Sequence, residues 1–326
     1  MATRQYYLFL FLFLIGCSPS DRVNDPESTL TIPESGSSAP AVIYRSNDVG
    51  KSWMPYDQGI PQAATVSALL SEDNTTYATT IHHGIYSMRY GEMRWTRLDS
   101  NLPEGIMVSS ITTGDGIIII GSYSHGIFVS RDGGRYWQPS LVSLKHTPVR
   151  SLLYDSHLVF AGTDNGVYRS TDQGNTWQQV FKGAQANGFT RLHDRIYVAL
   201  SNGALMTTDE GISWKYIYQP RALHDISNDG TNIYAMTLGD GLLTTGNDGV
   251  TWESINHGFG ATKWYTFEVK NIDRQIFAAQ WHGIYEFDLR NRTWIRLKNG
   301  LPDSTAFSTL EVAQYGLIAG IGLRKK

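Results

Sequence analysis

Short apolar runs separated by clusters of Gly, Asp, Asn and Ser make up the chain from residue 41 to residue 326. In one unit the runs are Val149 to Tyr154, Leu158 to Gly162 and Gly166 to Ser170, and a fourth begins at Trp177. Runs of this length between turn residues are typical of β-strands, and no helical periodicity is evident. The pattern predicts an all-β fold of four-stranded units, whose strands are called A, B, C and D in chain order.

A tryptophan marks the start of each predicted D strand. The series is Trp53, Trp95, Trp137, Trp177, Trp214, Trp252 and Trp294, with intervals of 37 to 42 residues. A period near 40 residues with four strand signals is typical of a β-propeller blade. Seven markers therefore predict seven blades.

The two ends of this array complement one another. The array opens at Ala41 to Tyr44 with a C strand, and it finishes at Phe307 to Val312 and Gly316 to Ile321 with an A and a B strand. We expect the N-terminal strands C and D to pair with the C-terminal strands A and B. This closure removes open sheet edges, which invite aggregation.

An octapeptide of the form S-x-D-x-G-x-x-W connects most predicted C and D strands. It occurs at residues 46–53, 130–137 and 170–177, with Thr first at 207–214, and with Thr first and Asn247 replacing Asp at 245–252. Asp closes local turns by accepting backbone N–H bonds, and Gly supplies a positive φ. The predicted structural residues are Asp48, Gly50, Trp53, Asp132, Gly134, Trp137, Asp172, Gly174, Trp177, Asp209, Gly211, Trp214, Gly249 and Trp252.

These octapeptides resemble the Asp-box, or bacterial neuraminidase (BNR), repeats of sialidases, xyloglucan-cleaving glycosidases, sortilin-type receptors and photosystem II assembly factors. The resemblance implies a β-propeller and leaves the activity open. In the sialidase family the active site lies on the face away from the Asp-boxes. The resemblance therefore directs the search for a site to the B–C and D–A connections.

The first 40 residues read as an export signal and a tether. Arg4 precedes an apolar run from Tyr6 to Ile15, too short to span a membrane and typical of a signal peptide. The run ends in Leu14-Ile15-Gly16-Cys17, which resembles the lipobox of bacterial lipoproteins and implies a lipid on Cys17. The alternative is an ordinary secretory signal with an incidental Cys.

This interpretation divides the chain into a signal at 1–17, a Ser- and Pro-rich tether at 18–40 and a propeller at 41–326. The composition of the tether is typical of disorder. Ser18 after the Cys favours the outer membrane in a cell that has two membranes, by the sorting rule of the lipoprotein family. Cys17 is the one cysteine, so no intramolecular disulfide can form.

Composition and net charge exclude few functions for this chain. The chain has 326 residues, 17% of them charged, and a formal net charge of −3. This charge argues against bulk electrostatic capture of nucleic acid. We expect a monomer, bound to the membrane through its lipid.

Basic and aromatic residues in the D–A and B–C connections form the candidate partner-binding set. They are Arg150, Arg191, Arg221, His224, Lys263, Trp264, Trp281 and His282. Such pairs of cations and aromatic rings are common at interface hot spots. The alternative is a solvated rim with local ion pairs, in which Arg191 pairs with Asp225 of the adjacent A strand.

Histidines also precede the Gly of three B–C turns, at His83, His125 and His282. A metal site is one interpretation. A type I′ turn, which needs positive φ at both central positions, is the favoured one. The sequence indicates no cofactor and no metal.

The sequence favours a non-catalytic, lipid-anchored propeller that binds a protein or glycan partner outside the cytoplasm, of a scaffold or assembly-factor type. The alternative is a glycoside hydrolase or lyase acting on extracellular carbohydrate, so enzymatic activity stays open. The arginine segment Phe/Tyr-Arg-Ile-Pro of sialidases is missing from the sequence, and no acidic pair stands out as the two carboxylates of glycoside hydrolysis. The Gly-Trp-Ala-Val segments of the photosystem II factors are also missing.

Overall fold

The computed structural model describes residues 40–99, 101–141, 144, 147–260, 265–303, 305–314 and 316–322. Cys17 and the predicted signal and tether up to residue 39 lie outside these residues, as do Lys263 and Trp264. Within the described residues the regular structure is entirely β, and no helix is long and apolar enough to cross a membrane.

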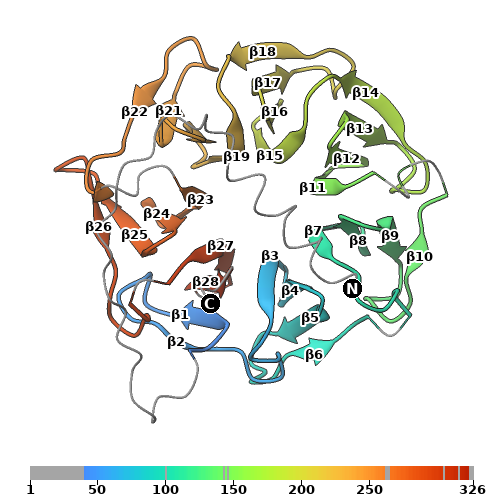
Figure 1. Cartoon of the computed structure of the whole chain (residues 1–326), viewed down its shortest axis with the longest axis horizontal. Helices are drawn as coiled ribbons and strands as arrows, with labels where there is room; N and C mark the ends of the chain where they lie inside the picture. The colour runs from blue at the N-terminus through green and yellow to red at the C-terminus, as the bar shows by residue number, and fades with distance from the viewer. Residues whose placement is uncertain are drawn as a thin grey trace, which may run out of the picture. The chain divides into compact units, whose positions relative to one another are not determined.

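Seven antiparallel four-stranded sheets form the propeller, which confirms the predicted all-β fold and blade count (Figure 1). The inner A strands are β3 (Thr65–Glu72), β7 (Val108–Gly114), β11 (Val149–Asp155), β15 (Ala186–Leu192), β19 (Leu223–Asn228), β23 (Thr266–Ile272) and β27 (Phe307–Ala313). The B strands are β4 (Thr75–Ile81), β8 (Ile117–Ser122), β12 (Leu158–Thr163), β16 (Arg195–Leu200), β20 (Ile233–Thr237), β24 (Gln275–Gln280) and β28 (Gly316–Ile321). We number blades 1 to 7 in the order of their A strands.

The C and D strands complete each blade toward the outside of the ring (Figure 1). The C strands are β5 (Gly84–Arg89), β9 (Gly126–Ser130), β13 (Gly166–Ser170), β17 (Gly203–Thr207), β21 (Leu242–Thr245), β25 (Gly283–Asp288) and β1 (Ile43–Ser46). The D strands are β6 (Thr96–Arg97), β10 (Gln138–Pro139), β14 (Gln178–Lys182), β18 (Lys215–Tyr218), β22 (Glu253–Ser254), β26 (Thr293–Arg296) and β2 (Met54–Pro55).

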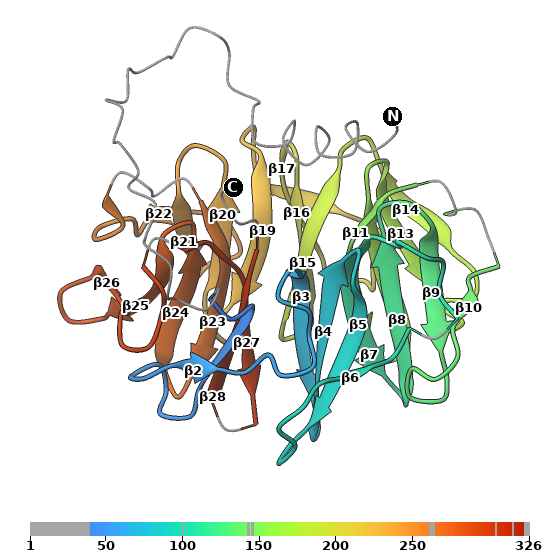
Figure 2. The ribbon, with the colours of Figure 1, turned by 60° about the horizontal axis from the view of Figure 1, so that its bottom comes forward.

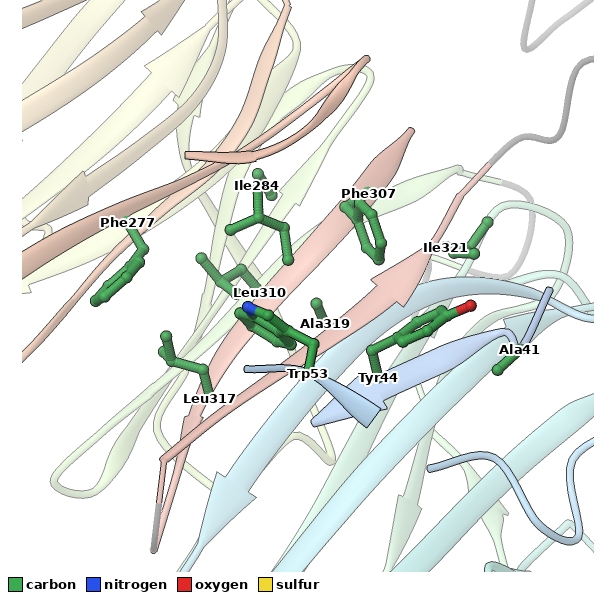
Figure 3. Packing of buried hydrophobic residues seen from close by; sticks show 11 residues of the cluster. Ala41, Tyr44, Trp53, Phe277, Ile284, Phe307, Leu310, Leu317, Ala319 and Ile321 are labelled. Carbon is green, nitrogen blue, oxygen red and sulfur yellow. The ribbon is translucent and has the colours of Figure 1, made fainter. Parts of the chain in front are cut away.

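Blade 7 closes the ring with strands from both ends of the propeller, as the sequence predicts. Its sheet has the order β2-β1-β28-β27, and β1 pairs antiparallel with β28 over Ile43 to Ser46. Figure 3 shows Tyr44 of β1 and Trp53, directly before β2, against Phe307 and Leu310 of β27. The two ends are therefore joined by backbone hydrogen bonds and by a shared apolar core.

Burial follows the position of the strand in the blade. The B strands β8, β12 and β28 are buried along their whole length, while the short D strands β6 and β10 are exposed. Each apolar cluster joins residues of neighbouring blades, as where Phe277 of blade 6 packs with the core of blade 7. Packing between blades therefore holds the ring together.

The octapeptide turns have one hydrogen-bond pattern. In the first, the Ser46 hydroxyl donates to Asp48 Oδ1 (2.7 Å) and accepts from Gly50 N–H (2.8 Å), and Asp48 Oδ1 accepts from Ser52 N–H (2.9 Å). Asn247 takes the place of Asp in the fifth turn and accepts from Thr245 Oγ1 and Thr251 N–H, both at 2.9 Å. A side-chain oxygen at this position is thus what the turn requires.

Four of the seven marker tryptophans connect neighbouring blades by a hydrogen bond to the backbone. The indole N–H donates to a backbone oxygen of the preceding blade from Trp95 (Tyr56 O, 2.6 Å), Trp137 (Leu98 O, 2.7 Å), Trp252 (Ile217 O, 3.2 Å) and Trp294 (Ile255 O, 2.6 Å). Trp95 and Trp294 lack the full octapeptide and keep this bond. The role of the tryptophan therefore survives the loss of the turn motif.

Because successive strands are antiparallel, the propeller has two different faces. The A–B turns and the octapeptide turns lie on one, called here the octapeptide face. The B–C turns and D–A connections lie on the other, called the B–C face. The strands of each blade run between them (Figure 2).

Candidate functional site

Every A strand has a β-bulge at the same place, one or two residues after it enters from the B–C face. The pairing of A with B strands shifts register around this residue in all seven blades. The bulged residues are Ser67, Ser109, Arg150, Asn187, His224, Phe267 and Ser308. Bulges re-aim side chains and are common beside functional sites. The fold therefore presents a ring of seven side chains near the axis of the B–C face.

Three of these side chains connect one blade to the next. Ser109 Oγ donates to Val149 O (2.5 Å), Asn187 Nδ2 to Leu223 O (2.8 Å) and Ser308 Oγ to Val66 O (3.1 Å). In each case the acceptor is the residue before the bulge in the following blade. A small polar side chain at this position thus stabilises the contact between two blades.

Blades 3, 5 and 6 have Arg150, His224 and Phe267 at the same position instead. Arg150 forms an ion pair with Asp164 of its own B–C turn, and its guanidinium lies 5.8 Å from the ring centre of Tyr123 in blade 2. Asp164 also accepts from Gln185 Nε2 of blade 4 (3.2 Å). The Arg150 side chain is only 14% exposed, and its charge is balanced by the carboxylate of Asp164.

Aromatic rings gather on blades 5 and 6. The ring of Phe267 lies 5.7 Å from His224 edge to face, and it stacks on Trp281 at 6.0 Å and on Tyr265 at 6.4 Å. Tyr265 and Trp281 are 5.6 Å apart. His224 is exposed and the other three are half-buried. We call these four residues the aromatic cluster.

The imidazole of His224 is neutral at neutral pH. One side of the ring is open to solvent, but the groups packed around the rest of it remove water. This desolvation, together with the positive charge of Arg150, lowers the pKa of His224 to about 4. The cluster therefore offers a neutral imidazole beside three aromatic rings, of which Tyr265 and Trp281 also carry a hydrogen-bonding group.

A carboxylate network lies next to the bulges, deeper along the A strands. Burial, together with the charge of Glu268, raises the pKa of Asp225 to about 8. Glu268 accepts from Leu310 N–H of blade 7 (2.7 Å), and Lys270 Nζ lies 3.0 Å from Glu268 and 2.8 Å from Glu311. Burial alone would lower the pKa of Lys270, but these two carboxylates raise it. The network joins blades 6 and 7 and fixes the strands under the aromatic cluster.

The structure brings together only part of the predicted binding set. Arg150, His224 and Trp281 lie at the B–C end of blades 3, 5 and 6, and His282 follows Trp281 in the B–C turn of blade 6. Arg221 lies in a D–A connection and pairs with Asp240 of the adjacent B–C turn at 3.2 Å. Lys263 and Trp264 lie outside the described residues.

The placement of Arg191 in a D–A connection is wrong. Arg191 stands near the end of β15, at the octapeptide face, and pairs with Asp155 of blade 3. Its predicted partner Asp225 lies near the opposite end of β19, at the position that Gly188 holds in blade 4. The bulges make this register difficult to derive from sequence spacing.

The type I′ prediction for the B–C turns is also wrong. Gly84, Gly126 and Gly283 have positive φ, but His83, His125 and His282 before them do not. Three B–C turns are closed by a Thr of the B strand, whose hydroxyl donates to the Gly carbonyl, as where Thr80 Oγ1 donates to Gly84 O (2.7 Å). Among the described residues no group of three His, Cys, Asp or Glu side chains could hold a metal ion.

Sequence reasoning missed the importance of Phe267. It lies within an ordinary-looking A strand, and a single sequence shows no bulge. An alignment of the seven repeats on their turn residues would have placed Phe267 at the position of Ser67, Ser109 and Ser308. A large aromatic residue would then have stood out among small polar ones.

No known family model and no curated protein matches this sequence. Solved propellers match its fold. One is the extracellular domain of BT4673 from B. thetaiotaomicron, described as a one-component system (TM-score 0.67, 13% identity, 81% of this chain and 38% of that chain). A second is YCF48 bound to D1 peptide (TM-score 0.63, 14% identity, 81% of this chain and 93% of that chain). A third is the GH74 enzyme of Niastella koreensis (TM-score 0.62, 17% identity, 79% of this chain and 51% of that chain).

This chain thus spans about 38% of the first of these chains and about half of the GH74 enzyme. At such identities the likeness shows the fold alone. Fold and site together define a seven-bladed β-propeller with an aromatic cluster on its B–C face.

Proposed function

We propose that this protein is a non-catalytic binding module, anchored by a lipid on Cys17 outside the cytoplasm, that holds a protein or glycan partner at its B–C face. The observation that carries the proposal is the ring of bulges. Blades 2, 4 and 7 use the bulged residue to connect blades. Blades 5 and 6 place His224 and Phe267 there, within the aromatic cluster. Departure from a local structural rule is expected at functional sites.

The chemistry of the face favours contact through rings and hydrogen bonds over contact through net charge. Arg150 and Arg221 are paired with Asp164 and Asp240, and His224 is neutral at pH 7. Aromatic side chains in such a setting are common hot spots of interfaces. The description of YCF48 as bound to a peptide supports a protein partner for a propeller of this kind.

The proposal can be tested by site-specific photocrosslinking in the producing cells. A photoreactive phenylalanine analogue replaces Trp281 on the B–C face, and a control replaces Ile212, which is 72% exposed in an octapeptide turn. We expect a discrete adduct from position 281 that is absent from position 212. Adducts of equal yield from both positions would count against the B–C face as the binding surface.

A glycoside hydrolase or lyase is the second candidate, and one observation favours it. Asp225 and Glu268 hold the same position in adjacent blades beside the aromatic cluster, and the raised pKa of Asp225 suits a general acid. However, Glu268 already accepts from Leu310 N–H and binds Lys270. Release of sugar from a panel of polysaccharides, lost in Asp225→Asn, would favour the enzyme over the binding module.

A further inference from the structure

A small cavity lies on the octapeptide face between blades 7 and 1, on the opposite side from the aromatic cluster. Its volume is about 60 Å³. The walls come from the end of β1, the start of β28, the A–B turn of blade 1 and the end of β5. A cavity needs about 10–15 Å³ to hold one water molecule. This one has room for a small polar group and not for a large ligand.

Arg45 is the fixed cation of this cavity. Its guanidinium lies 4.2 Å over the ring of Tyr56, and that ring packs edge to face on Trp95 of blade 1 at 6.1 Å. The Nε atom is buried without a hydrogen-bond acceptor. Within the described residues no carboxylate lies within ion-pair distance of Arg45. The side chain is therefore held against Tyr56, and no carboxylate of the described residues is paired with its guanidinium.

The lining carries net positive charge only when Arg45 is included, and it combines polar groups with apolar side chains such as Leu317 and Ile318. Arg89 is a second cation of the lining, and Asp73 is its one carboxylate among the described residues. Asn47, Asn74 and Thr76 also line the cavity, and Thr76 Oγ1 lies 3.0 Å from Ser71 Oγ. Two cations and several neutral hydrogen-bonding groups in a small space suit an anion.

We propose that this cavity binds a carboxylate group, with Arg45 as its main partner. A planar guanidinium matches the two oxygens of a carboxylate, and such charged hydrogen bonds are about twice as strong as neutral ones. The carboxylate can come from a free small acid or from an Asp or Glu side chain of a partner. This site is independent of the partner surface proposed for the B–C face.

The chain offers a matched control for Arg45. Arg169 holds the same position in the C strand of blade 3, directly before the Ser of its octapeptide. Its Nε is also buried without an acceptor, but its Nη1 donates to Glu210 O (2.9 Å). Arg169 does not line this cavity.

Saturation-transfer NMR on the full chain at constant ionic strength tests the proposal, with acetate, an Asp-rich hexapeptide and inorganic phosphate as probes. We expect Arg45→Gln to weaken carboxylate binding by about tenfold or more. Arg45→Lys keeps the charge but not the planar guanidinium, and its affinity for carboxylates is expected to lie between that of the unchanged protein and that of Arg45→Gln. Arg169→Gln should bind as the unchanged protein does.

Each outcome decides the proposal. Stronger binding of the peptide assigns the site to a partner's acidic segment, and equal or stronger binding of acetate assigns it to free small acids. The proposal is overturned if neither carboxylate binds, if phosphate binds better than both, or if Arg45→Gln and Arg169→Gln have equal effects. Thermal unfolding of both variants shows whether either has lost its fold.

Discussion

Asp225 shows how a single residue in this propeller depends on its neighbours. It follows the bulged His224, and its carboxylate lies against Gly188 of blade 4, where a Cβ would collide with it. Glu268 is in blade 6 on the other side, and its charge adds to the effect of burial on the pKa of Asp225. The sequence shows an ordinary acidic residue here, because the register that brings these groups together depends on the bulges.

We predict that Asp225 makes stability fall as the pH rises. Its pKa is about 8 in the folded chain against an ordinary value of 3.8, so between these values the folded state binds a proton that the unfolded state has lost. The free energy of unfolding then falls by up to about 1.4 kcal/mol per pH unit. Chemical denaturation from pH 4 to pH 9 should show this slope, which is flatter in Asp225→Asn. Equal slopes for both proteins would refute the assignment.

Cys17 allows a second test at this scale. If it carries a lipid, Cys17→Ser should move the protein from the membrane fraction to the soluble fraction, because the anchor is lost. Fractionation with an immunoblot measures the change, and incorporation of a labelled fatty acid should disappear with it. Ser18→Ala is the control, and it should keep the label. Membrane association of Cys17→Ser would show that another feature holds the chain there.

The octapeptide turn is the element that the sequence predicts best. Its hydrogen bonds depend on local side chains, and therefore they follow from residue type and spacing. The B–C turns were predicted less well. Their Asn-Gly and His-Gly pairs suggest type I′ geometry, whereas the Asn or His directly before the Gly does not take positive φ, and in three turns a Thr hydroxyl of the preceding strand donates to the Gly carbonyl.

Two adjacent glycines in one octapeptide separate backbone strain from packing. Gly133 and Gly134 both have positive φ, but a Cβ on Gly133 meets nothing within 4 Å, while one on Gly134 would lie 2.9 Å from Leu98 of blade 1. Gly133→Ala should cost about 1 kcal/mol, from backbone strain alone. Gly134→Ala adds overpacking, typically about 1–3 kcal/mol. Denaturant midpoints measure both, and equal losses would show that Leu98 moves aside freely.

At the scale of the whole propeller, the spacing of seven tryptophans was enough to predict the number of blades, and the strand patterns at the two ends of the array predicted the closure. Spacing carries this information because each Trp stands at the start of a D strand, and most of the indoles are buried where two blades meet. The binding face could not be predicted in the same way. The aromatic cluster joins residues of two blades, and Arg191 was assigned to the wrong face.

Closure of blade 7 makes the ring cooperative. Deletion of residues 305–326 removes β27 and β28 and leaves β1 with an open edge. We predict loss of the single sharp thermal transition and aggregation of the product. Deletion of residues 18–39 is the control and should leave the transition temperature unchanged. A shortened chain that still unfolds in one sharp step would contradict this role for blade 7.

The most direct measurement of the central claim is partner recovery by two matched variants. Partner crosslinked to the unchanged protein is identified by mass spectrometry, and its affinity for the purified chain is then measured by calorimetry. His224→Ala with Trp281→Ala removes two members of the aromatic cluster and is expected to weaken binding by tenfold or more, that is by about 1.4 kcal/mol or more. Ile212→Ala with Val250→Ala alters exposed side chains of two octapeptide turns and should leave the affinity unchanged. Unchanged affinity in the first variant and weakened affinity in the second would contradict the assignment of the B–C face.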